Sequence, residues 1–427
     1  MHHLNRTIPP LGWTTYGYNN RYGTFMPEEI WEKNIDWVAD TFRESGFTMI
    51  CNDGWTVNEE YNRDGYLTKY DDRYQHDIAY WADYIRKKGL VPGIYWNPLW
   101  ISTAAGGDPF CKIQGTDLPV SSLCHEDDRY KFSNCYWADI TQPGAENYVK
   151  GYMNYFKSMG IQYMKIDFLS WYESGKDWNL GEVCHAHGRE NYKKALTWIR
   201  EAAGEEMQLL LCMGNLKHDA EYESVYGDLI RINNDIGSGT WETFSLDRRG
   251  QRTPDTWSQW SNTFDGFIGW AHLARDKKVL LDGDYPTISS YSNDLERKTV
   301  ISLYVMAGSP LIICEWDEVD DNYSDFYKNP FLLRLLKQGF RGEPLRGDPS
   351  NELSQIWKGR DSDGSWIVGL FNREEKPRVR SIDFTKELGI SLGKIYELWE
   401  RNPAGISDEY TAVLAPHACR LIQVTPV

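Results

Sequence analysis

Eight short apolar segments, each followed by a helical pattern, place the strongest constraint on how this chain can fold. They alternate over roughly the first 330 residues. The apolar segments are Pro10–Trp13, Phe47–Cys51, Leu90–Trp96, Tyr163–Asp167, Gln208–Cys212, Leu229–Asn233, Val279–Leu281 and Leu311–Cys314. The clearest helical patterns are Pro27–Arg43, Ile78–Lys88, Asn147–Met159, Asn191–Ala203 and Leu295–Ala307. Eight β-α units predict a (β/α)8 TIM barrel with long loops. A doubly wound open sheet is the alternative, but no Gly-rich phosphate turn follows the first segment.

The pattern changes beyond about residue 340, where short alternating segments replace the β-α units. These segments are Gln355–Trp357, Trp366–Phe371, Val379–Phe384, Lys394–Trp399, Tyr410–Leu414 and Arg420–Val424. Asp363-Gly364 and Asn402-Pro403 supply turns between them. We therefore expect a catalytic barrel over residues 1–338 and a C-terminal antiparallel β-sandwich over residues 339–427.

The charge balance excludes several kinds of partner. The net charge is −16 and no block of Lys and Arg is present, which argues against nucleic acid and anionic membranes. No apolar run approaches the roughly 18–20 residues of a membrane span. The first residues lack the apolar region of a signal peptide. We expect a secreted or periplasmic protein whose leader is absent from this sequence, with a cytoplasmic location as the alternative.

The cysteines and histidines give little sign of a metal or cofactor. A long insertion at residues 102–136 contains Cys111, Cys124 and Cys135, which could include one disulfide. Their spacing, and that of the Cys-His-Ala-His segment at residues 184–187, fits no standard zinc pattern. We expect the insertion to shape a substrate site or form a solvated turn. No metal and no cofactor are predicted.

Polar and aromatic residues follow nearly every predicted barrel strand. In a TIM barrel the active site lies at the C-terminal ends of the strands, so these residues are the candidates for function. They are Trp13, Tyr16, Asn52, Asp53, Trp55, Tyr95, Trp96, Lys165, Asp167, Cys212, Met213, Arg231, Asp235, Asp282 and Asp284. Carboxylates and aromatic rings that meet in one cleft are what glycoside hydrolysis needs.

The segment Tyr163–Phe168 is central to this hypothesis. Lys165 and Asp167 point to the same face of a strand, and a cation beside a carboxylate favours the ionised form that a nucleophile requires. A lone Lys-x-Asp pair is more often a structural ion pair. The carboxylates and rings at the other strand ends favour the catalytic interpretation here.

Several motifs resemble, in order, the signatures of glycoside hydrolase family 27, the α-galactosidase and α-N-acetylgalactosaminidase family. They are Leu11-Gly12-Trp13, Asn52-Asp53-Gly54-Trp55, Gly93-Ile94-Tyr95, Tyr163–Asp167, Arg231–Ile236, Leu281–Tyr285, Met306–Leu311, Leu398–Arg401 and Pro416–Leu421. The resemblance covers nearly the whole chain. Single motifs are weakly specific, but their order and spacing are strongly so.

This resemblance implies a retaining, two-step mechanism. Asp167 matches the nucleophile, Asp235 the acid/base and Arg231 an arginine that binds the sugar near its 2-hydroxyl. Asp235 must be protonated while Asp167 is ionised, so we expect Lys165 near Asp167 and a drier site for Asp235. Retention also predicts about 5–5.5 Å between the two carboxyl groups.

The resemblance assigns sugar-binding roles to further strand-end residues. Asp53 matches the second member of a carboxylate pair for the 4- and 6-hydroxyls, Tyr16 a stacking position and Tyr95 a pocket wall. Trp13, Lys165 and Asp284 join this substrate-binding set. Asn52 and Met213 depart from the family pattern: Asn52 stands where the pair usually has a second Asp, and Met213 follows Cys212 without a carboxylate. An amide donates as well as accepts, so the preferred sugar need not be galactose.

The leading function is a retaining exo-glycosidase that releases terminal α-D-galactosyl-type residues from an oligosaccharide or polysaccharide. The alternatives with the same mechanism are β-L-arabinopyranosides, α-N-acetylgalactosaminides, and α-glucosidic or isomaltosyl linkages. A transglycosylase would use the same covalent intermediate. A catalytically inactive sugar-binding protein is disfavoured because both Asp167 and Asp235 are present.

Overall fold

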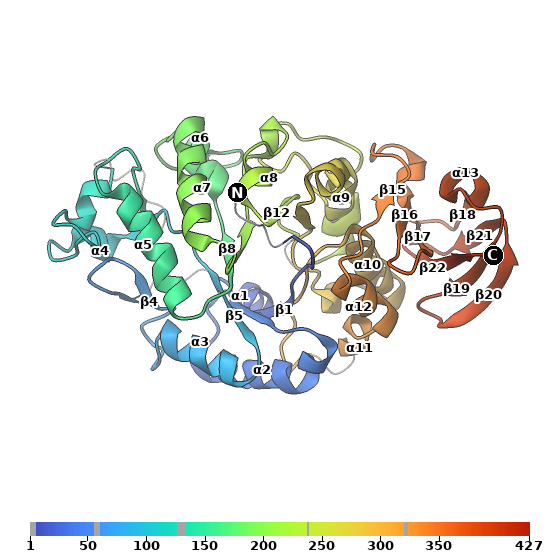
Figure 1. Cartoon of the computed structure of the whole chain (residues 1–427), viewed down its shortest axis with the longest axis horizontal. Helices are drawn as coiled ribbons and strands as arrows, with labels where there is room; N and C mark the ends of the chain where they lie inside the picture. The colour runs from blue at the N-terminus through green and yellow to red at the C-terminus, as the bar shows by residue number, and fades with distance from the viewer. Residues whose placement is uncertain (1–5, 55–59, 126–133, 237–238, 320–322) are drawn as a thin grey trace.

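The chain folds into a barrel followed by a β-sandwich, which lie side by side along the long axis of the molecule (Figure 1). The computed structural model describes residues 6–54, 60–125, 134–236, 239–319 and 323–427. In Figure 1 the barrel runs from blue through yellow into orange, and the sandwich forms the red end.

Eight parallel strands form one curled sheet, which confirms the barrel prediction. Their order in the sheet is β13, β12, β11, β8, β5, β2, β1 and β14. The first strand, β1, therefore lies between β2 and β14, and β13 and β14 form the two ends of the sheet. The strands are β1 Leu11–Thr14, β2 Met49–Asn52, β5 Val91–Tyr95, β8 Tyr163–Ile166, β11 Gln208–Leu211, β12 Leu229–Arg231, β13 Leu280–Asp282 and β14 Leu311–Ile313. Because all eight run in the same direction, their C-terminal ends gather at one face.

Helices connect the strands, close to the predicted bounds. They are α1 Tyr16–Tyr22, α2 Glu28–Thr41, α3 Ile78–Lys87, α4 Thr103–Gly107, α5 Ala145–Ser158, α6 Leu169–Ser174, α7 Arg189–Ala203, α8 Glu223–Tyr226, α9 Thr263–Gly269, α10 Asp294–Ala307, α11 Ser324–Tyr327, α12 Pro330–Lys337 and α13 Phe384–Leu388. Local chemistry sets their ends: the Asn293 side chain accepts a hydrogen bond from the Glu296 N–H at the start of α10, and left-handed Gly308 (φ 65°) ends it.

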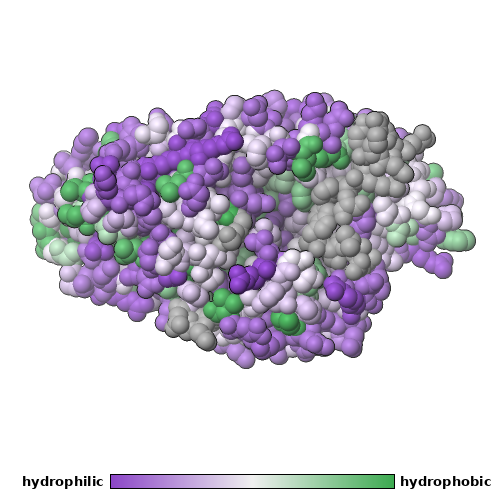
Figure 2. Space-filling view, turned by 180° about the vertical axis from the view of Figure 1, so that it is seen from behind, coloured by the Kyte–Doolittle hydropathy of each residue, from purple (hydrophilic) through white to green (hydrophobic). Residues whose placement is uncertain are grey.

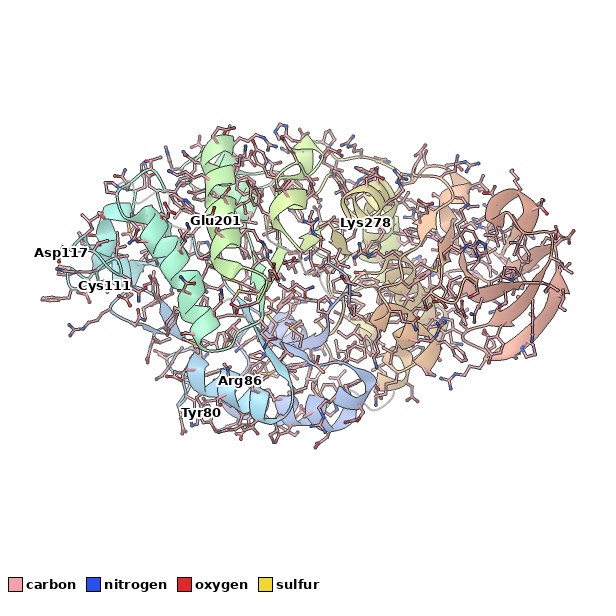
Figure 3. The ribbon with its side chains drawn as sticks, viewed as in Figure 1. Tyr80, Arg86, Cys111, Asp117, Glu201 and Lys278 are labelled. Carbon is pink, nitrogen blue, oxygen red and sulfur yellow. The ribbon has the colours of Figure 1, made fainter. Side chains whose placement is uncertain are left out.

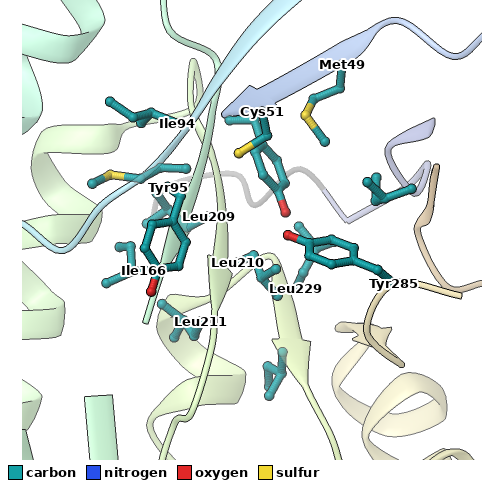
Figure 4. Close-up of a cluster of buried hydrophobic side chains, with 14 of the residues drawn as sticks. Met49, Cys51, Ile94, Tyr95, Ile166, Leu209, Leu210, Leu211, Leu229 and Tyr285 are labelled. Carbon is teal, nitrogen blue, oxygen red and sulfur yellow. The ribbon is translucent and has the colours of Figure 1, made fainter. Parts of the chain in front are cut away.

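Apolar side chains from neighbouring strands fill the barrel interior. Figure 4 shows Leu209, Leu210 and Leu211 of β11 beside Ile166 of β8, with the rings of Tyr95 and Tyr285 in the same cluster. Large aromatic residues continue this core toward the helices, where the rings of Trp13 and Trp31 lie 5.5 Å apart between centroids. The core therefore holds the strand ends in a fixed relation to one another.

The described part of the insertion, residues 102–125 and 134–136, lies at the end of the molecule opposite the sandwich, where Figure 3 labels Cys111 and Asp117. It is tied to the barrel by an antiparallel pair, β6 Trp100–Ser102 and β7 Cys135–Trp137. Further short strands are β3 Glu60–Tyr61, β4 Leu67–Lys69, β9 Lys176–Asp177 and β10 Gly181–Glu182. Cys111 carries a free thiol 3.7 Å from the Asp108 carboxylate, so it takes no part in the disulfide that the sequence allowed.

The C-terminal strands form a six-stranded antiparallel sheet and a two-stranded one, as the sandwich prediction requires. The larger sheet contains β15 Glu343–Pro344, β16 Ile356–Arg360, β17 Trp366–Phe371, β22 Cys419–Pro426, β19 Gly393–Glu397 and β20 Asn402–Ser407. The smaller one pairs β18 Arg378–Asp383 with β21 Glu409–Leu414. The boundary between residues 338 and 339 stays a prediction.

One predicted turn is wrong. Asn402-Pro403 begins strand β20, which lies at the edge of the larger sheet and pairs with β19 across a bulge between Ile395 and Tyr396. Proline lacks the N–H that a central strand would need, but an edge strand tolerates it. The Asn-Pro signal therefore marked an edge strand in this chain.

Buried polar contacts join the sandwich to the barrel. Arg373, fully buried, makes an ion pair of 2.6 Å with buried Asp265 of α9, and its Nε donates to Ser245 Oγ at 2.9 Å. The Trp399 indole N–H donates to Ser302 Oγ of α10 at 2.8 Å. The two domains are therefore held by more than their connecting chain.

The outer surface is mainly hydrophilic, with small scattered apolar residues on the face that Figure 2 shows. In the described parts of the chain, none of the helices has the length and apolar character to cross a membrane.

Candidate active site

The C-terminal ends of the barrel strands bring most of the predicted residues together. Their hydrogen bonds and ion pairs form two connected groups, one around Lys165 and Asp53 and one around Arg231. Asp167 lies one residue beyond β8 and contacts Tyr95, the last residue of β5. Residues from six strand ends thus line one region, although they are far apart in the sequence.

Lys165 is the centre of the first group. Its ammonium donates to Asp53 Oδ2 at 2.9 Å and to the Tyr285 hydroxyl at 3.2 Å. Tyr285 also donates to Asp53 Oδ2. The ring centroids of Tyr285, Tyr95 and Tyr16 lie 4.6, 5.4 and 5.9 Å from the Lys165 nitrogen. Burial acts to lower the pKa of Lys165, but the nearby carboxylates raise it well above its usual value, so the group is a cation.

Lys165 acts on Asp167 by its charge, as expected, but it forms its ion pair with a different carboxylate. Lys165 pairs with Asp53, the residue that follows β2, because side chains of different strands converge inside a barrel. Phe168 has a left-handed backbone (φ 61°), so the chain turns directly after Asp167. The Phe168 N–H then donates to Asp167 Oδ1 at 2.7 Å, and the Tyr95 hydroxyl donates to Oδ2 at 3.2 Å.

Asp167 is a buried carboxyl group held in one orientation. Both oxygens accept hydrogen bonds, and the Asn97 amide donates to its backbone carbonyl at 2.7 Å. Burial raises the pKa of Asp167, the positive charge of Lys165 opposes this rise, and the negative charge of Asp235 adds to it. Lys165 therefore supports the ionised form of Asp167 by its charge and without direct contact.

Arg231 connects the second group. Its Nη2 lies 2.7 Å from Asp235 Oδ1 and 2.7 Å from Asp284 Oδ2. Asp284, with φ 74°, also accepts the Ile236 N–H at 3.0 Å. Burial raises the pKa of Asp284 to about 7, which the charge of Arg231 opposes and that of Asp235 reinforces.

Asp235 does not occupy the drier site that the sequence predicted. Its side chain is 67% exposed, whereas that of Asp284 is 4% exposed. The prediction rested on the need for a protonated acid, which burial would have met. Asp235 instead lies at the mouth of the cleft, where a leaving group and water can both reach it.

Three other predicted binding residues occupy different places. Asn52 is buried beside the site, and its Oδ1 accepts a hydrogen bond from Thr15 Oγ1 at 3.1 Å. Met213 has φ 47° and lines the cleft. Trp13 is fully buried and its indole N–H donates to the Glu315 carbonyl at 2.6 Å, so its ring belongs to the core and does not face the cleft.

Sequence reasoning missed two residues that hold the site. Tyr285 bridges Lys165 and Asp53, and Asn97 fixes the backbone of Asp167. Tyr285 directly follows Asp284 at a strand end, which was the available signal. Nothing in the sequence around Asn97 distinguishes it from an ordinary loop amide. Trp55 lies outside the described residues.

A cleft of about 530 Å³ opens beside this group. Asp235, Met213 and Phe168 are among the residues that line it. A larger hollow of about 1050 Å³ lies elsewhere, between the barrel and the sandwich, and none of the strand-end candidates lines it. The chemistry of the residues, and not the size of the hollow, therefore identifies the site.

Among the residues that the structure describes, no group of three His, Cys, Asp or Glu side chains is arranged to hold a metal ion. The segment at residues 184–187 has a packing role: the His187 ring stacks on Tyr172 at 3.9 Å between centroids. Burial lowers the pKa of His187 to about 4.

Comparisons with known proteins agree with this architecture. Residues 20–180 match the family model described as Alpha galactosidase A, and residues 351–424 match the Alpha galactosidase C-terminal beta sandwich domain. The chain is 41% identical over 432 residues to the isomalto-dextranase of Arthrobacter globiformis, an alignment that covers 98% of this chain and 67% of that protein. An α-galactosidase of Oryza sativa is 22% identical, with 99% of this chain and 86% of that protein covered.

Two solved structures extend the comparison. The isomalto-dextranase of Arthrobacter globiformis T6 complexed with panose superposes with a TM-score of 0.94 at 39% identity, covering 100% of this chain and 75% of that one. A β-L-arabinopyranosidase from Geobacillus stearothermophilus has a TM-score of 0.77 at 19% identity, covering 99% and 97%. The second likeness shows the fold alone.

Proposed function

The chain belongs to glycoside hydrolase family 27, and from this premise we propose that it is a retaining glycosidase acting on α-glucosidic linkages of an isomalto-type glucan. The observation that carries the proposal is the 41% identity to an isomalto-dextranase over nearly the whole chain. The α-galactosidases that it resembles are only 22% identical. We therefore set the α-glucosidic alternative ahead of the α-galactosyl reading of the sequence.

Asp167 is the nucleophile in this proposal. Its carboxylate attacks the anomeric carbon and forms a covalent glycosyl ester. The hydrogen bonds from Phe168 N–H and Tyr95 Oη hold the carboxylate in one orientation, so little rotational freedom is lost on attack. Lys165 contributes a positive charge that favours the ionised form.

Asp235 is the acid/base. It gives a proton to the leaving oxygen in the first step and takes a proton from water in the second. Its exposed place at the mouth of the cleft suits both tasks, because the leaving group departs and water enters by the same route. Arg231, bonded to Asp235 at 2.7 Å, holds the side chain toward the cleft.

Asn52 and Asp53 support a sugar other than galactose. Asp53 is already engaged by Lys165 and Tyr285, and Asn52 offers an amide N–H group where the family pattern has a carboxylate. A carboxylate only accepts hydrogen bonds, whereas an amide also donates. An amide in place of the carboxylate changes which arrangement of the C4 and C6 hydroxyls the site can bind.

A panel of substrates tests the proposal. The purified protein is assayed on dextran, on isomalto-oligosaccharides, and on nitrophenyl α-glucoside, α-isomaltoside, α-galactoside, α-N-acetylgalactosaminide and β-L-arabinopyranoside. We expect cleavage of the α-1,6-glucan and of at least one α-glucosyl aryl substrate. Cleavage of the α-galactoside without any α-glucosidic activity would restore the α-galactosyl reading, and a wholly inactive panel would refute both.

The mechanism is tested separately from the substrate. The first-formed sugar should have the α configuration by NMR, and Asp167→Asn should lower kcat by at least about a thousandfold with an unchanged melting temperature. An inverted first product would contradict the two-step mechanism. The ratio of transfer product to free sugar at high acceptor concentration distinguishes a hydrolase from a transglycosylase.

A further inference from the structure

A groove lined by tryptophans continues outward from Asp235. The 530 Å³ cleft and a smaller neighbouring hollow share four lining residues, so they form one path across the surface. The shared residues are Trp171, Asp177, Trp178 and Trp257. Asp235 lines the 530 Å³ cleft, whereas Asp167 lines neither hollow. The groove therefore approaches the reaction centre from the side of the acid/base.

Trp178 lies at the tip of the hairpin formed by β9 and β10 and is 52% exposed. Asp177 fixes this tip. Its Oδ1 accepts the N–H groups of Asn179 and Leu180 at 2.8 and 2.9 Å, and its Oδ2 accepts the Trp171 indole N–H at 3.0 Å. One carboxylate thus ties the hairpin turn to the groove floor. A large exposed ring held in this way is a preformed platform.

The other walls are also rigid. The Trp171 ring packs on that of Phe168, the residue that follows Asp167, at 4.6 Å between centroids. Trp257 is 6% exposed, and its carbonyl accepts the Leu216 N–H at 3.0 Å. Asp247 and Arg248 add hydrogen-bonding groups to the aromatic walls.

Backbone conformation adds an independent observation. Three residues that line the cleft, Phe168, Met213 and Arg248, have φ values of 61°, 47° and 47°. Non-glycine residues adopt this left-handed region at an energetic cost, and such residues concentrate at binding sites. The cleft is thus built from strained loop positions that the surrounding packing maintains.

We propose that this groove binds the leaving-group side of an oligosaccharide substrate, with Trp178 stacking on a sugar unit beyond the one attached to the cleaved bond. The inference rests on the proposed function, because the acid/base protonates the leaving oxygen and so faces the departing part of the chain. The flat apolar faces of sugar rings match indole rings, and their hydroxyls match Asp247 and Arg248. A cleft of about 530 Å³ has the size of an oligosaccharide-binding site, within the roughly 300–1,000 Å³ range of ligand pockets.

The test compares two substrates that share the same donor sugar. One is an isomalto-oligosaccharide that fills the groove, and the other is the nitrophenyl α-glycoside that the enzyme cleaves. We expect Trp178→Ala to lower the ratio of the two kcat/KM values, oligosaccharide over nitrophenyl glycoside, by about tenfold. Trp178→Phe, which keeps an aromatic face, should restore most of the ratio.

Leu180→Ala is the matched control. Leu180 lies on the same hairpin and is 67% exposed, but it lines neither hollow, so the ratio should not change. An equal loss on both substrates for Trp178→Ala would indicate a structural role and overturn the proposal, as would an unchanged ratio.

A binding measurement separates this proposal from the proposed function. Calorimetric titration of Asp167→Asn with isomaltopentaose, which is long enough to reach Trp178 with one or two donor sugars bound, needs no turnover, and adding Trp178→Ala should weaken the measured Kd by about tenfold. Equal affinity in the two variants overturns the groove proposal even if the enzyme cleaves α-glucans. Absence of α-glucan cleavage by the parent enzyme, with intact Trp178-dependent binding, refutes only the proposed reaction.

Discussion

Replacing Glu223 with glutamine should remove a pH dependence of stability that originates beneath the active-site loop. Glu223 begins α8, is fully buried and accepts a hydrogen bond from the Tyr192 hydroxyl at 2.7 Å. Gly214, next to Met213 of the cleft, packs so closely that an added Cβ would lie 2.7 Å from the Glu223 Cγ. Burial raises the pKa of Glu223 from 4.5 to about 7, and the charge of Glu173 adds to the rise, whereas Tyr192 and Arg189 oppose it.

The size of the effect follows from that shift. Because the folded state holds the proton more tightly, this group stabilises the fold fully below pH 4.5, and the contribution is lost as the pH rises through about 7. At 1.36 kcal/mol per unit, the shift corresponds to about 3 kcal/mol of unfolding free energy. Glutamine keeps the acceptor for Tyr192 but does not titrate.

Urea unfolding of the parent and of Glu223→Gln at pH 5 and pH 8 measures this directly. We expect the free-energy difference between the two proteins to change by about 3 kcal/mol between these pH values, in favour of the variant at pH 8. Glu221→Gln is the control, because that side chain is 63% exposed and pairs with Arg189 at 2.8 Å. A difference between parent and Glu223→Gln that is the same at both pH values would refute the reasoning.

Three further perturbations test the site and the domain contact. Arg373→Met leaves the buried carboxylate of Asp265 unpaired and should lower the unfolding free energy by about 3–5 kcal/mol in urea, with much of the loss recovered when Asp265→Leu is added. Lys165→Met removes the charge that lowers the pKa of Asp167, so the acid limb of kcat/KM should move to higher pH; a limb that stays in place would contradict the assignment. Asp235→Ala should slow cleavage of oligosaccharides far more than that of a nitrophenyl glycoside, whose leaving group needs little protonation, as initial rates on the two substrates will show.

Much of the fold was predictable because its signals are local. Each barrel strand is a short apolar run between polar loops, and helices such as α3 and α10 begin and end within a residue or two of their predicted bounds. The error at Asn402-Pro403 shows where local signals fail. The same dipeptide suits a turn or an edge strand, and only its position in the sheet separates the two.

The contacts within the site were less predictable. Lys165 and Asp167 are neighbours in the sequence, but the cation pairs with Asp53 from a different strand. Asn97 bonds to Asp167 across 70 positions of the sequence, and Tyr285 bonds to Asp53 across 232 positions. Trp13 belongs to one of the family motifs, but its side chain packs in the core.

The sequence by itself determined the order of the strand ends and the chemical groups they carry, including Asp167 and Asp235, because apolar periodicity and side-chain identity are properties of the chain alone. Only the tertiary structure decided which cation meets which carboxylate, that Asp235 is exposed while Asp167 is buried, and that Trp178 faces the same cleft. The physical reason is that burial and charge pairing depend on distances between residues from different strands. Those distances exist only once the barrel has formed.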